Sequence, residues 1–170
     1  IITPALTWAT TVYPIINIGA KPVFVDVDPE TYTVKTKDVE SAITKKTSTL
    51  MPVNLLGNAC DMKGLVKISN QNNLMLIEDT CEAHGGEFNG KKLGSFGDMS
   101  TFSFFMSHHI TTIEGGMLVT NNEKLYEIAK SIRAFGWIRD LKDRQKIASK
   151  YSSIDERFLF TNIGFNIRPT

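Results

Sequence analysis

The sequence predicts an α/β fold: a mostly parallel central sheet with helices on both of its faces, in a three-layer α/β/α arrangement. Two observations carry this expectation. Short β-branched runs alternate with amphipathic stretches at a spacing of about 25 residues, the rhythm of strand–helix–strand units. The runs are also nearly all apolar rather than alternating with polar residues, which is typical of parallel strands buried on both faces.

The first elements can be placed in order. Strands are expected at residues 22–27, 49–54 and 74–79, because each run is apolar and ends in polar residues. Helices are expected between them, at 36–45 and 61–71. Since such sheets bind ligands beyond the carboxyl ends of their strands, the residues that follow each strand are candidates for function.

Later elements have more local signals. Five glycines within residues 85–98 predict a hairpin-like excursion with tight turns, and the alternating run 99–105 predicts a further strand. Thr120 and Glu123 have the spacing of a capping box, so we expect a helix to begin there and to stop at Gly136. That helix would have one apolar face, formed by Leu125, Ile128, Ala129, Ile132 and Phe135.

Composition excludes several classes of function. The 170 residues carry 19 basic and 18 acidic side chains, whereas a nucleic-acid binder usually shows a clear basic excess. Because no apolar run approaches the roughly 20 residues of a membrane helix, we expect a cytoplasmic protein without a membrane partner. Cys60 and Cys81 are too few for a disulfide framework and are expected to be reduced. Residues 137–157 hold 10 charged positions in 21 and predict an exposed loop or insertion.

Two polar positions lie where this fold binds ligands. Asp79 ends a predicted strand, where a carboxylate can bind the protonated nitrogen of a heterocycle, although such a residue is also commonly a helix cap or a solvated turn. Ser103 lies in a strand beside the glycine-rich loop and suits phosphate binding, with a hydroxyl satisfied inside the strand as the alternative. The spacing of His84, His108 and His109 does not match a helical metal pair, so no metal site is expected.

Several strings along the chain fit together in one order. They lie at residues 3–10, 19–28, 77–85, 94–98, 102–104, 114–116 and 164–170. In this order they resemble the DegT/DnrJ/EryC1/StrS family of sugar aminotransferases, over essentially the whole chain. The resemblance implies a fold type I pyridoxal phosphate enzyme that works as a homodimer on a nucleotide-linked keto sugar. Residues 1–170 would be part of its large, cofactor-binding domain, without the N-terminal phosphate-loop segment and the C-terminal small domain.

Matching positions imply roles for five cofactor-binding residues. Asp79 would pair with the pyridine nitrogen, and Trp8 would stack on the ring. Glu82 stands where the family usually has a Gln beside the ring hydroxyl. Ser103 would bind the phosphate, and Asn166 would reach the cofactor phosphate of the neighbouring subunit. The resemblance therefore implies an active site that is complete only in the dimer.

Besides Glu82, the chain departs from the family pattern at Met106, Ile113 and, with the largest consequence for the chemistry, His108. Between Phe-Ser-Phe and Glu-Gly-Gly, ordinary aminotransferases of the family have a Lys that bonds covalently to the cofactor, and this chain has His108 there. Imidazole forms no Schiff base but transfers protons near neutral pH. A His is typical of the branch that acts as 3-dehydratases on 4-keto-6-deoxy nucleotide sugars. The resemblance thus implies pyridoxal or pyridoxamine phosphate chemistry with His108 as the catalytic base, an amino donor such as glutamate, and a place in lipopolysaccharide or other surface polysaccharide biosynthesis.

Alternatives remain beside this reading. The chain could belong to a nucleotide-sugar aminotransferase of the same family, or to a non-catalytic family member. Some 3-dehydratases also hold an iron–sulfur cluster on four cysteines, the first at a position that matches Cys81. The other three positions read Arg139, Leu141 and Ser149 here, and since such a cluster needs four thiolates, we expect no iron–sulfur cluster.

Overall fold

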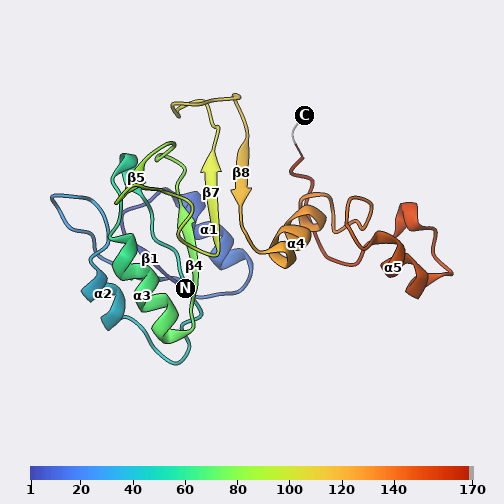
Figure 1. The fold of residues 1–170 in the computed structure, drawn as a ribbon, viewed down its shortest axis with the longest axis horizontal. Coiled ribbons are helices and arrows are strands. Elements are labelled where there is room, and N and C mark those ends of the chain that lie inside the picture. Colours follow the sequence, from blue (N-terminus) through green and yellow to red (C-terminus); the bar gives the residue numbers. More distant parts are fainter. Residues whose placement is uncertain (169–170) are drawn as a thin grey trace. The chain divides into compact units, whose positions relative to one another are not determined.

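The structure, a computed structural model, describes residues 1–168 and divides after Val119 into two compact units (Figure 1). The described part of the first unit contains a six-stranded sheet with the strand order β2-β1-β3-β4-β7-β8. All neighbouring strands are parallel except β7 and β8, which are antiparallel, so the expected mostly parallel sheet is confirmed. The strands are β1 (Ile2–Pro4), β2 (Val23–Val25), β3 (Thr49–Leu50), β4 (Met75–Asp79), β7 (Met99–Ser103) and β8 (Gly116–Val119).

The strands are shorter than the apolar runs that predicted them. The run 49–54 forms a ladder only at β3, because Pro52 has no N–H to donate to a neighbouring strand. Pairing nevertheless continues past Pro52, since its carbonyl accepts from the amide of Asp79, and the Asn54 amide donates to the Asp79 carbonyl. Both the N–H and the C=O of Asp79 are therefore hydrogen-bonded to the segment that follows β3.

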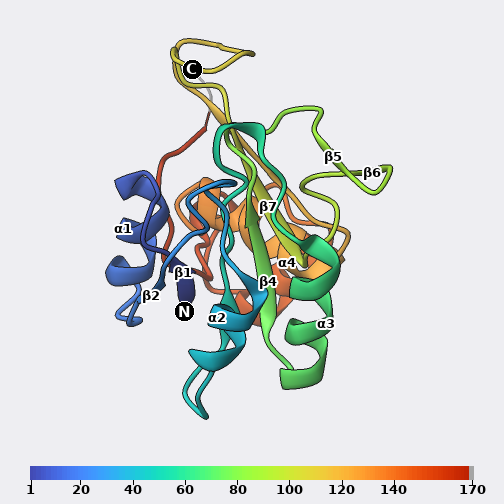
Figure 2. The same cartoon turned by 90° about the vertical axis from the view of Figure 1, so that its left-hand side faces the viewer.

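Helices cover both faces of the sheet, as expected. Figure 2 shows α1 (Ala9–Asn17) on one side of the strands, and α2 (Thr36–Ser41) and α3 (Met62–Asn72) on the other. Side chains along β4 alternate accordingly, since successive residues of a strand point to opposite faces. Leu76 packs into the core that α3 covers, whereas Asp79 contacts α1.

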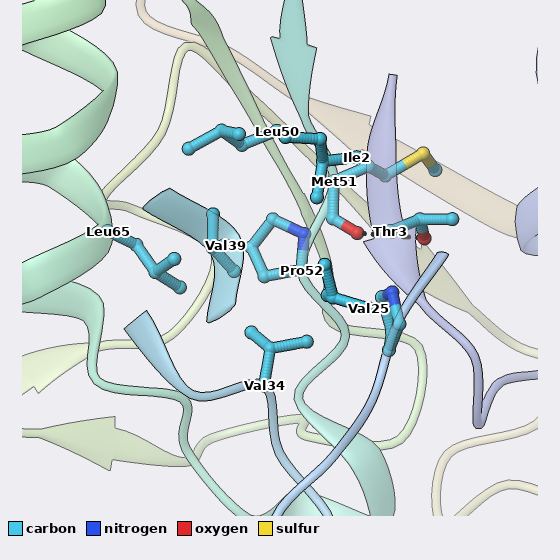
Figure 3. Close-up of a pocket in the computed structure, with 10 residues that line it drawn as sticks. Ile2, Thr3, Val25, Val34, Val39, Leu50, Met51, Pro52 and Leu65 are labelled. Carbon is cyan, nitrogen blue, oxygen red and sulfur yellow. Dashed lines mark hydrogen bonds between the residues drawn. The ribbon is translucent and has the colours of Figure 1, made fainter. Parts of the chain in front are cut away.

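The core lies between the sheet and the two helices α2 and α3. Asp61 caps α3, its side chain accepting from the amide of Gly64. Figure 3 shows the middle of this core, where Val39 and Leu65 of the helices face Ile2 and Leu50 of the strands. The cavity there has a volume of about 10 Å³, close to the least that one water molecule needs. This region is packed interior without room for a ligand, so a ligand-binding site is to be sought at the ends of the strands.

The glycine-rich segment forms the predicted hairpin. Strands β5 (Glu87–Phe88) and β6 (Lys91–Lys92) pair in antiparallel fashion. Asn89 and Gly90 join them with φ angles of 50° and 76°. Positive φ at both central residues is the signature of a type I′ turn, which matches the twist of paired strands and explains the Asn-Gly sequence.

The second unit begins with α4 (Glu123–Arg133), and here the predicted cap is wrong. Asn122 is the N-cap, and its Oδ1 accepts from the amides of Lys124 and Leu125. Thr120 lies outside the helix, and its hydroxyl accepts from the Asn122 amide instead. Asn is at least as good an N-cap as Thr, so the helix starts two residues later than a capping box on Thr120 would place it.

α4 ends at Arg133 with Ala134 as its C-cap, so it stops earlier than the predicted end at Gly136. Gly136 follows the helix at a φ of 90°, where a Cβ would lie only 1.6 Å from the carbonyl oxygen of Asn162. Of the residues expected on the apolar face of this helix, Phe135 lies beyond its end with a φ of 63°. Ile128 lies within the helix but is 48% exposed.

Residues 137–157 are more ordered than a loop. They contain α5 (Arg144–Ala148), the 3₁₀ turn η2 (Ser149–Tyr151) and the start of a second, η3 (Glu156–Phe158). Ile138 is fully buried within this segment, and Trp137 stacks on Phe160 with 5.5 Å between ring centroids. The helical pieces are single turns, too short to produce an apolar period in the sequence. Among the described residues, no helix has the length and apolar character needed to cross a membrane.

Candidate active site

Asp79 is the last residue of β4, and both of its carboxylate oxygens are held. The hydroxyl of Thr11, on α1, donates to Oδ2 at 2.7 Å, and the backbone amide of Cys81 donates to Oδ1 at 3.2 Å. The residue is only 8% exposed. Two donors from different elements fix the plane of this carboxylate, so it points in one direction from the end of the strand.

Ser103 lies on the same face of the sheet as Asp79. Thr101 of β7 is the direct partner of Asp79 on β4, and paired residues of parallel strands project to the same side. Ser103 follows two residues later and therefore projects to that side too, roughly 7 Å further along β7. The topology thus brings a fixed carboxylate and a hydroxyl to adjacent strand ends.

The start of α1 belongs to this same face. Trp8 is the N-cap residue of α1, and its side chain is 76% exposed. Thr11 lies one turn further on, where it contacts Asp79, and its hydroxyl also lies 2.8 Å from that of Thr7. Because α1 carries both Trp8 and the donor to Asp79, one helix places an exposed indole and the buried carboxylate relative to each other.

Glu82 lies in the turn after β4. Its Oε2 accepts from the amide of Leu56 at 2.8 Å. Leu56 belongs to the 3₁₀ turn η1 (Leu55–Gly57) and has a φ of 53°, a left-handed conformation that is uncommon for leucine. The carboxylate of Glu82 therefore ties the turn after β4 to the segment after β3.

Cys81 lies between Asp79 and Glu82 and is half-buried. Burial, followed by the negative charge of Asp79, raises the pKa of its thiol to about 12. The sulfur lies 3.9 Å from both the carbonyl oxygen and the hydroxyl of Thr101. A thiol with this pKa stays protonated at neutral pH and is therefore a poor nucleophile. Within residues 1–168, no three His, Cys, Asp or Glu side chains gather as a metal site would require.

His108 lies in the loop between β7 and β8. The Ser103 hydroxyl accepts from the amide of Phe105 at 3.2 Å and so turns the chain out of β7. The His108 amide then donates to the carbonyl of Phe105, and the imidazole meets the Phe105 ring edge-on, 6.5 Å between centroids. His108 is half-buried, whereas the neighbouring His109 is exposed. The loop therefore presents one partly covered imidazole beyond the strand that carries Ser103.

Asn166 belongs to the second unit, where it forms an isolated bridge with Ala134. Its Oδ1 accepts from Nε of Arg168 at 3.0 Å. The other five residues singled out in the sequence all lie in the first unit, at the carboxyl ends of its strands or at the start of α1.

Three residues that the sequence analysis did not assign a role hold this arrangement together. Thr11 supports Asp79, His84 contacts the carbonyl of Ser103, and the fully buried Glu78 accepts from backbone amides of the glycine-rich segment. The spacing of Thr11 to Trp8, one helical turn, is a signal that helical periodicity could have supplied. The contacts of His84 and Glu78 join distant segments and have no local signal.

Known proteins are similar to this chain in sequence and in fold. A family model described as the DegT/DnrJ/EryC1/StrS aminotransferase family matches residues 1–170. The chain is 42% identical over 171 residues to GDP-4-keto-6-deoxy-D-mannose 3-dehydratase of Yersinia pseudotuberculosis, covering 99% of this chain and 44% of that protein. It is 48% identical over 127 residues to GDP-perosamine synthase of Escherichia coli O157:H7, covering 75% of this chain and 35% of the relative.

A solved structure is similar over nearly the whole chain. It is a crystal structure of GDP-4-keto-6-deoxymannose-3-dehydratase with a trapped PLP-glutamate geminal diamine, with a TM-score of 0.90 and 40% identity. The match covers 99% of this chain and 44% of that one. The chain thus spans less than half the length of the relatives that it matches.

Proposed function

Because this chain belongs to the DegT/DnrJ/EryC1/StrS aminotransferase family, as the sequence strings predicted, we propose that it is part of a pyridoxal phosphate-dependent sugar 3-dehydratase. The substrate would be a nucleotide-linked 4-keto-6-deoxy sugar that loses its C3 hydroxyl. One observation carries the proposal: the chain is 42% identical to a 3-dehydratase, and it has a His at position 108, where the resemblance implies the family's Lys. The 1–170 segment would be most of the large, cofactor-binding domain.

The residues at the strand ends suit a phosphorylated pyridine. The oriented carboxylate of Asp79 suits a ring nitrogen, and the exposed indole of Trp8 suits the face of a ring. The hydroxyl of Ser103 suits a phosphate oxygen. Asp79 and Ser103 project to one face, and α1 brings Trp8 to the same face. When bound, pyridoxal or pyridoxamine phosphate would supply the amine chemistry and the electron-accepting ring.

Asp79 would hold a proton on the ring nitrogen. An ionised carboxylate beside that nitrogen favours its protonated form, which makes the ring a better electron acceptor. The donors Thr11 and Cys81 leave part of the acceptor capacity of this carboxylate for such a contact, since a carboxylate has about four acceptor sites. Glu82 would lie beside the ring hydroxyl, held there through the amide of Leu56.

His108 would remove and return the proton in the chemical step. An imidazole ring nitrogen without a hydrogen can accept a proton and later return it. A general base of this kind contributes about 10²- to 10⁴-fold to rate. An imidazole cannot take over the covalent role of a Lys amine, so the change of residue favours dehydration over ordinary transamination.

The remaining assignments are part of the same proposal and draw on these relatives and on the family resemblance. The amino donor would be glutamate, as in the PLP-glutamate adduct of the 3-dehydratase structure. The sugar would carry GDP, the nucleotide named in both relatives. The product would enter lipopolysaccharide or other surface polysaccharide biosynthesis in the cytoplasm, and a relative that is 36% identical over 182 residues is named a lipopolysaccharide biosynthesis protein. Asn166 would contact the cofactor phosphate of a second subunit in a homodimer.

A second candidate function is a nucleotide-sugar aminotransferase. It is favoured by the 48% identity to a GDP-perosamine synthase, higher than the 42% to the 3-dehydratase although over a shorter stretch. A third, a family member without catalysis, would bind cofactor and release no product.

Product mass separates these functions. The full-length protein is incubated with GDP-4-keto-6-deoxymannose, pyridoxal phosphate and glutamate, and the sugar nucleotide is analysed by mass spectrometry. We expect a product that has lost one oxygen atom, with glutamate converted to 2-oxoglutarate and ammonia. A product in which an amino group has replaced the C4 ketone would overturn the dehydratase proposal. So would a Lys adduct trapped by borohydride, and an unchanged sugar would favour the non-catalytic reading.

A further inference from the structure

The hydrogen-bond ladder between β4 and β7 is completed by a side chain. The amide of Thr80 donates to the carbonyl of Thr101, which extends the parallel pairing just past Asp79. Successive carbonyls of a strand point in alternate directions. The carbonyl of Ser103, two residues after Thr101, therefore points to the same side as that of Thr101, toward the chain that follows β4. The chain has turned away there, with the Ala83 amide donating to the Thr80 carbonyl, and Nε2 of His84 lies 2.9 Å from the Ser103 oxygen instead.

The imidazole of His84 is seated between two aromatic rings. Its centroid lies 5.3 Å from that of Phe102 and 5.5 Å from that of Phe104, both in tilted orientations. These rings flank Ser103 in the sequence and project to the face opposite to its hydroxyl. His84 therefore contacts Ser103 from behind, through the backbone, and leaves the hydroxyl to the face that carries Asp79.

Ser103 is also the base of the loop that carries His108. Its hydroxyl accepts from the Phe105 amide, and the adjoining carbonyl of Phe104 accepts from the amide of Thr112 and, at 3.1 Å, from the hydroxyl of Thr111. These bonds close the loop on the β8 side. The bond from His84 is the tie on the β4 side, so the loop base is held from both directions.

We propose that His84 is a positioning residue, whose imidazole fixes Ser103 and the base of the His108 loop relative to Asp79. The inference rests on the proposed function, because it treats Ser103 as the phosphate-binding hydroxyl and His108 as the base. A carbonyl only accepts, so Nε2 of His84 must carry the hydrogen. Both the neutral Nε2–H tautomer and the imidazolium meet that requirement, so protonation of His84 does not break the tie.

Two substitutions separate the hydrogen bond from the ring. In His84→Phe, a ring remains between Phe102 and Phe104, but the donor to Ser103 is lost. In His84→Gln, the amide nitrogen lies at nearly the same reach as Nε2 and can donate, but the aromatic contact is lost. Each variant is the control for the other.

The test is made on the full-length protein with two readouts. The dissociation constant of pyridoxal phosphate is measured by fluorescence quenching, and kcat and KM for the sugar nucleotide are measured separately. We expect His84→Phe to weaken cofactor binding about tenfold, which corresponds to about 1.4 kcal/mol. It should lower kcat by a similar factor while KM for the sugar changes little. His84→Gln should restore both values to within about threefold of the wild type, since its donor keeps most of a neutral hydrogen bond.

Three results would overturn the inference. The first is a His84→Phe variant that binds the cofactor as tightly as the wild type. The second is a His84→Gln variant that is as impaired as His84→Phe. The third is a lower thermal midpoint of the apoprotein with unchanged cofactor binding and kcat. The last result would make His84 only a packing residue. Failure of the proposed function is distinguishable, because the wild-type protein would then bind no pyridoxal phosphate or release no deoxygenated sugar.

Discussion

At the carboxyl end of β4, two neighbouring carboxylates point to opposite faces of the sheet. Glu78 is fully buried, and its oxygens accept from the amides of Gly94, Phe96 and Gly97 at 2.7–2.8 Å. Asp79, on the face of α1, accepts from one hydroxyl and one amide. Both residues end the same strand, and each is held by hydrogen bonds from segments distant in the sequence.

The difference between the two faces lies in the donors. Backbone N–H groups only donate, so the three amides around Glu78 require a hydrogen-bond acceptor at both terminal atoms of the side chain. A hydroxyl can donate or accept, so Thr11 can adapt to another group at position 79. The Glu78 face is thus committed to holding the glycine-rich segment, while the Asp79 face keeps acceptor capacity for a ligand. Two adjacent acidic residues of one motif can therefore differ in role: Glu78 stabilises a loop, while Asp79 is available to a ligand.

The largest effect is expected at the chemical face. In Asp79→Asn, Oδ1 can still accept from the Cys81 amide and the new NH₂ can donate to Thr11, so the fold should persist. The charge that would hold a proton on the cofactor nitrogen is lost. We expect kcat to fall about 10²- to 10³-fold, the range seen when a preorganised electrostatic contact is removed. Steady-state kinetics and a thermal melt of the full-length protein measure the two effects, and unfolding of the variant would remove the contrast between the faces.

The matched change at the structural face should have the reverse outcome. In Glu78→Gln, one side of the amide still accepts, but its NH₂ meets backbone N–H groups that can only donate. We expect the free energy of unfolding to fall by about 2 kcal/mol or more, because a buried donor loses its partner. Denaturant unfolding measures this loss. A Glu78→Gln protein as stable as the wild type would show that the two carboxylates are held in equivalent ways.

The contact of Thr11 with Asp79 should have a smaller effect. Thr11→Val keeps the shape of the side chain and removes the donor to Oδ2. We expect kcat to fall about tenfold, equivalent to about 1.4 kcal/mol, because the carboxylate loses one of its two fixing bonds. Thr11→Ser retains the hydroxyl and serves as the control, measured by the same kinetics. Equal activity in both variants would mean that the Cys81 amide alone orients Asp79.

The smallest expected effect is a change in the reactivity of the two thiols, Cys60 and Cys81, which lie near the two carboxylates. Burial, the leading cause in each case, raises the pKa of both Cys60 and Cys81 to about 12 from the ordinary 9.0. Carboxylate charges add to these shifts, chiefly the charge of Glu78 for Cys60 and that of Asp79 for Cys81. Both thiols should therefore resist iodoacetamide at pH 8 in the folded protein. Asp79→Asn should speed alkylation of Cys81 and leave Cys60 unchanged, as mass spectrometry of labelled peptides would show.

The same shifts predict a dependence of stability on pH. Below about pH 9, both states keep their thiol protons, and the thiols add no pH dependence. Between about pH 9 and pH 12, the unfolded chain releases protons that the folded chain retains, so stability falls as the pH rises. Replacement of either cysteine by Ser should flatten this fall, measured by denaturant unfolding across that window. An unchanged slope would assign the alkaline loss to other groups.

Much of the fold could be predicted because its signals are local. The apolar runs of β4 and of the strand 22–27, the Asn89-Gly90 turn and the glycine after α4 each fit one element, whatever surrounds it. Predictions failed where neighbours compete or periods are too short to be seen. Asn122 displaced Thr120 as the cap of α4, and the single-turn helices of 137–157 have no apolar period.

The sequence by itself determined the family, the alternation of strands and helices, and the identity of the residues at the strand ends, because these depend on residue type and order. It also placed an imidazole at position 108, in the loop that follows Ser103. Only the tertiary structure decided that Asp79 and Ser103 lie on one face of the sheet and that Glu78 points to the other. It also decided that Thr11 contacts Asp79 and that His84 contacts Ser103. Strand register and side-chain alternation make those assignments, and hydrogen bonds between residues such as Thr11 and Asp79, 68 positions apart, exist only once the chain has folded.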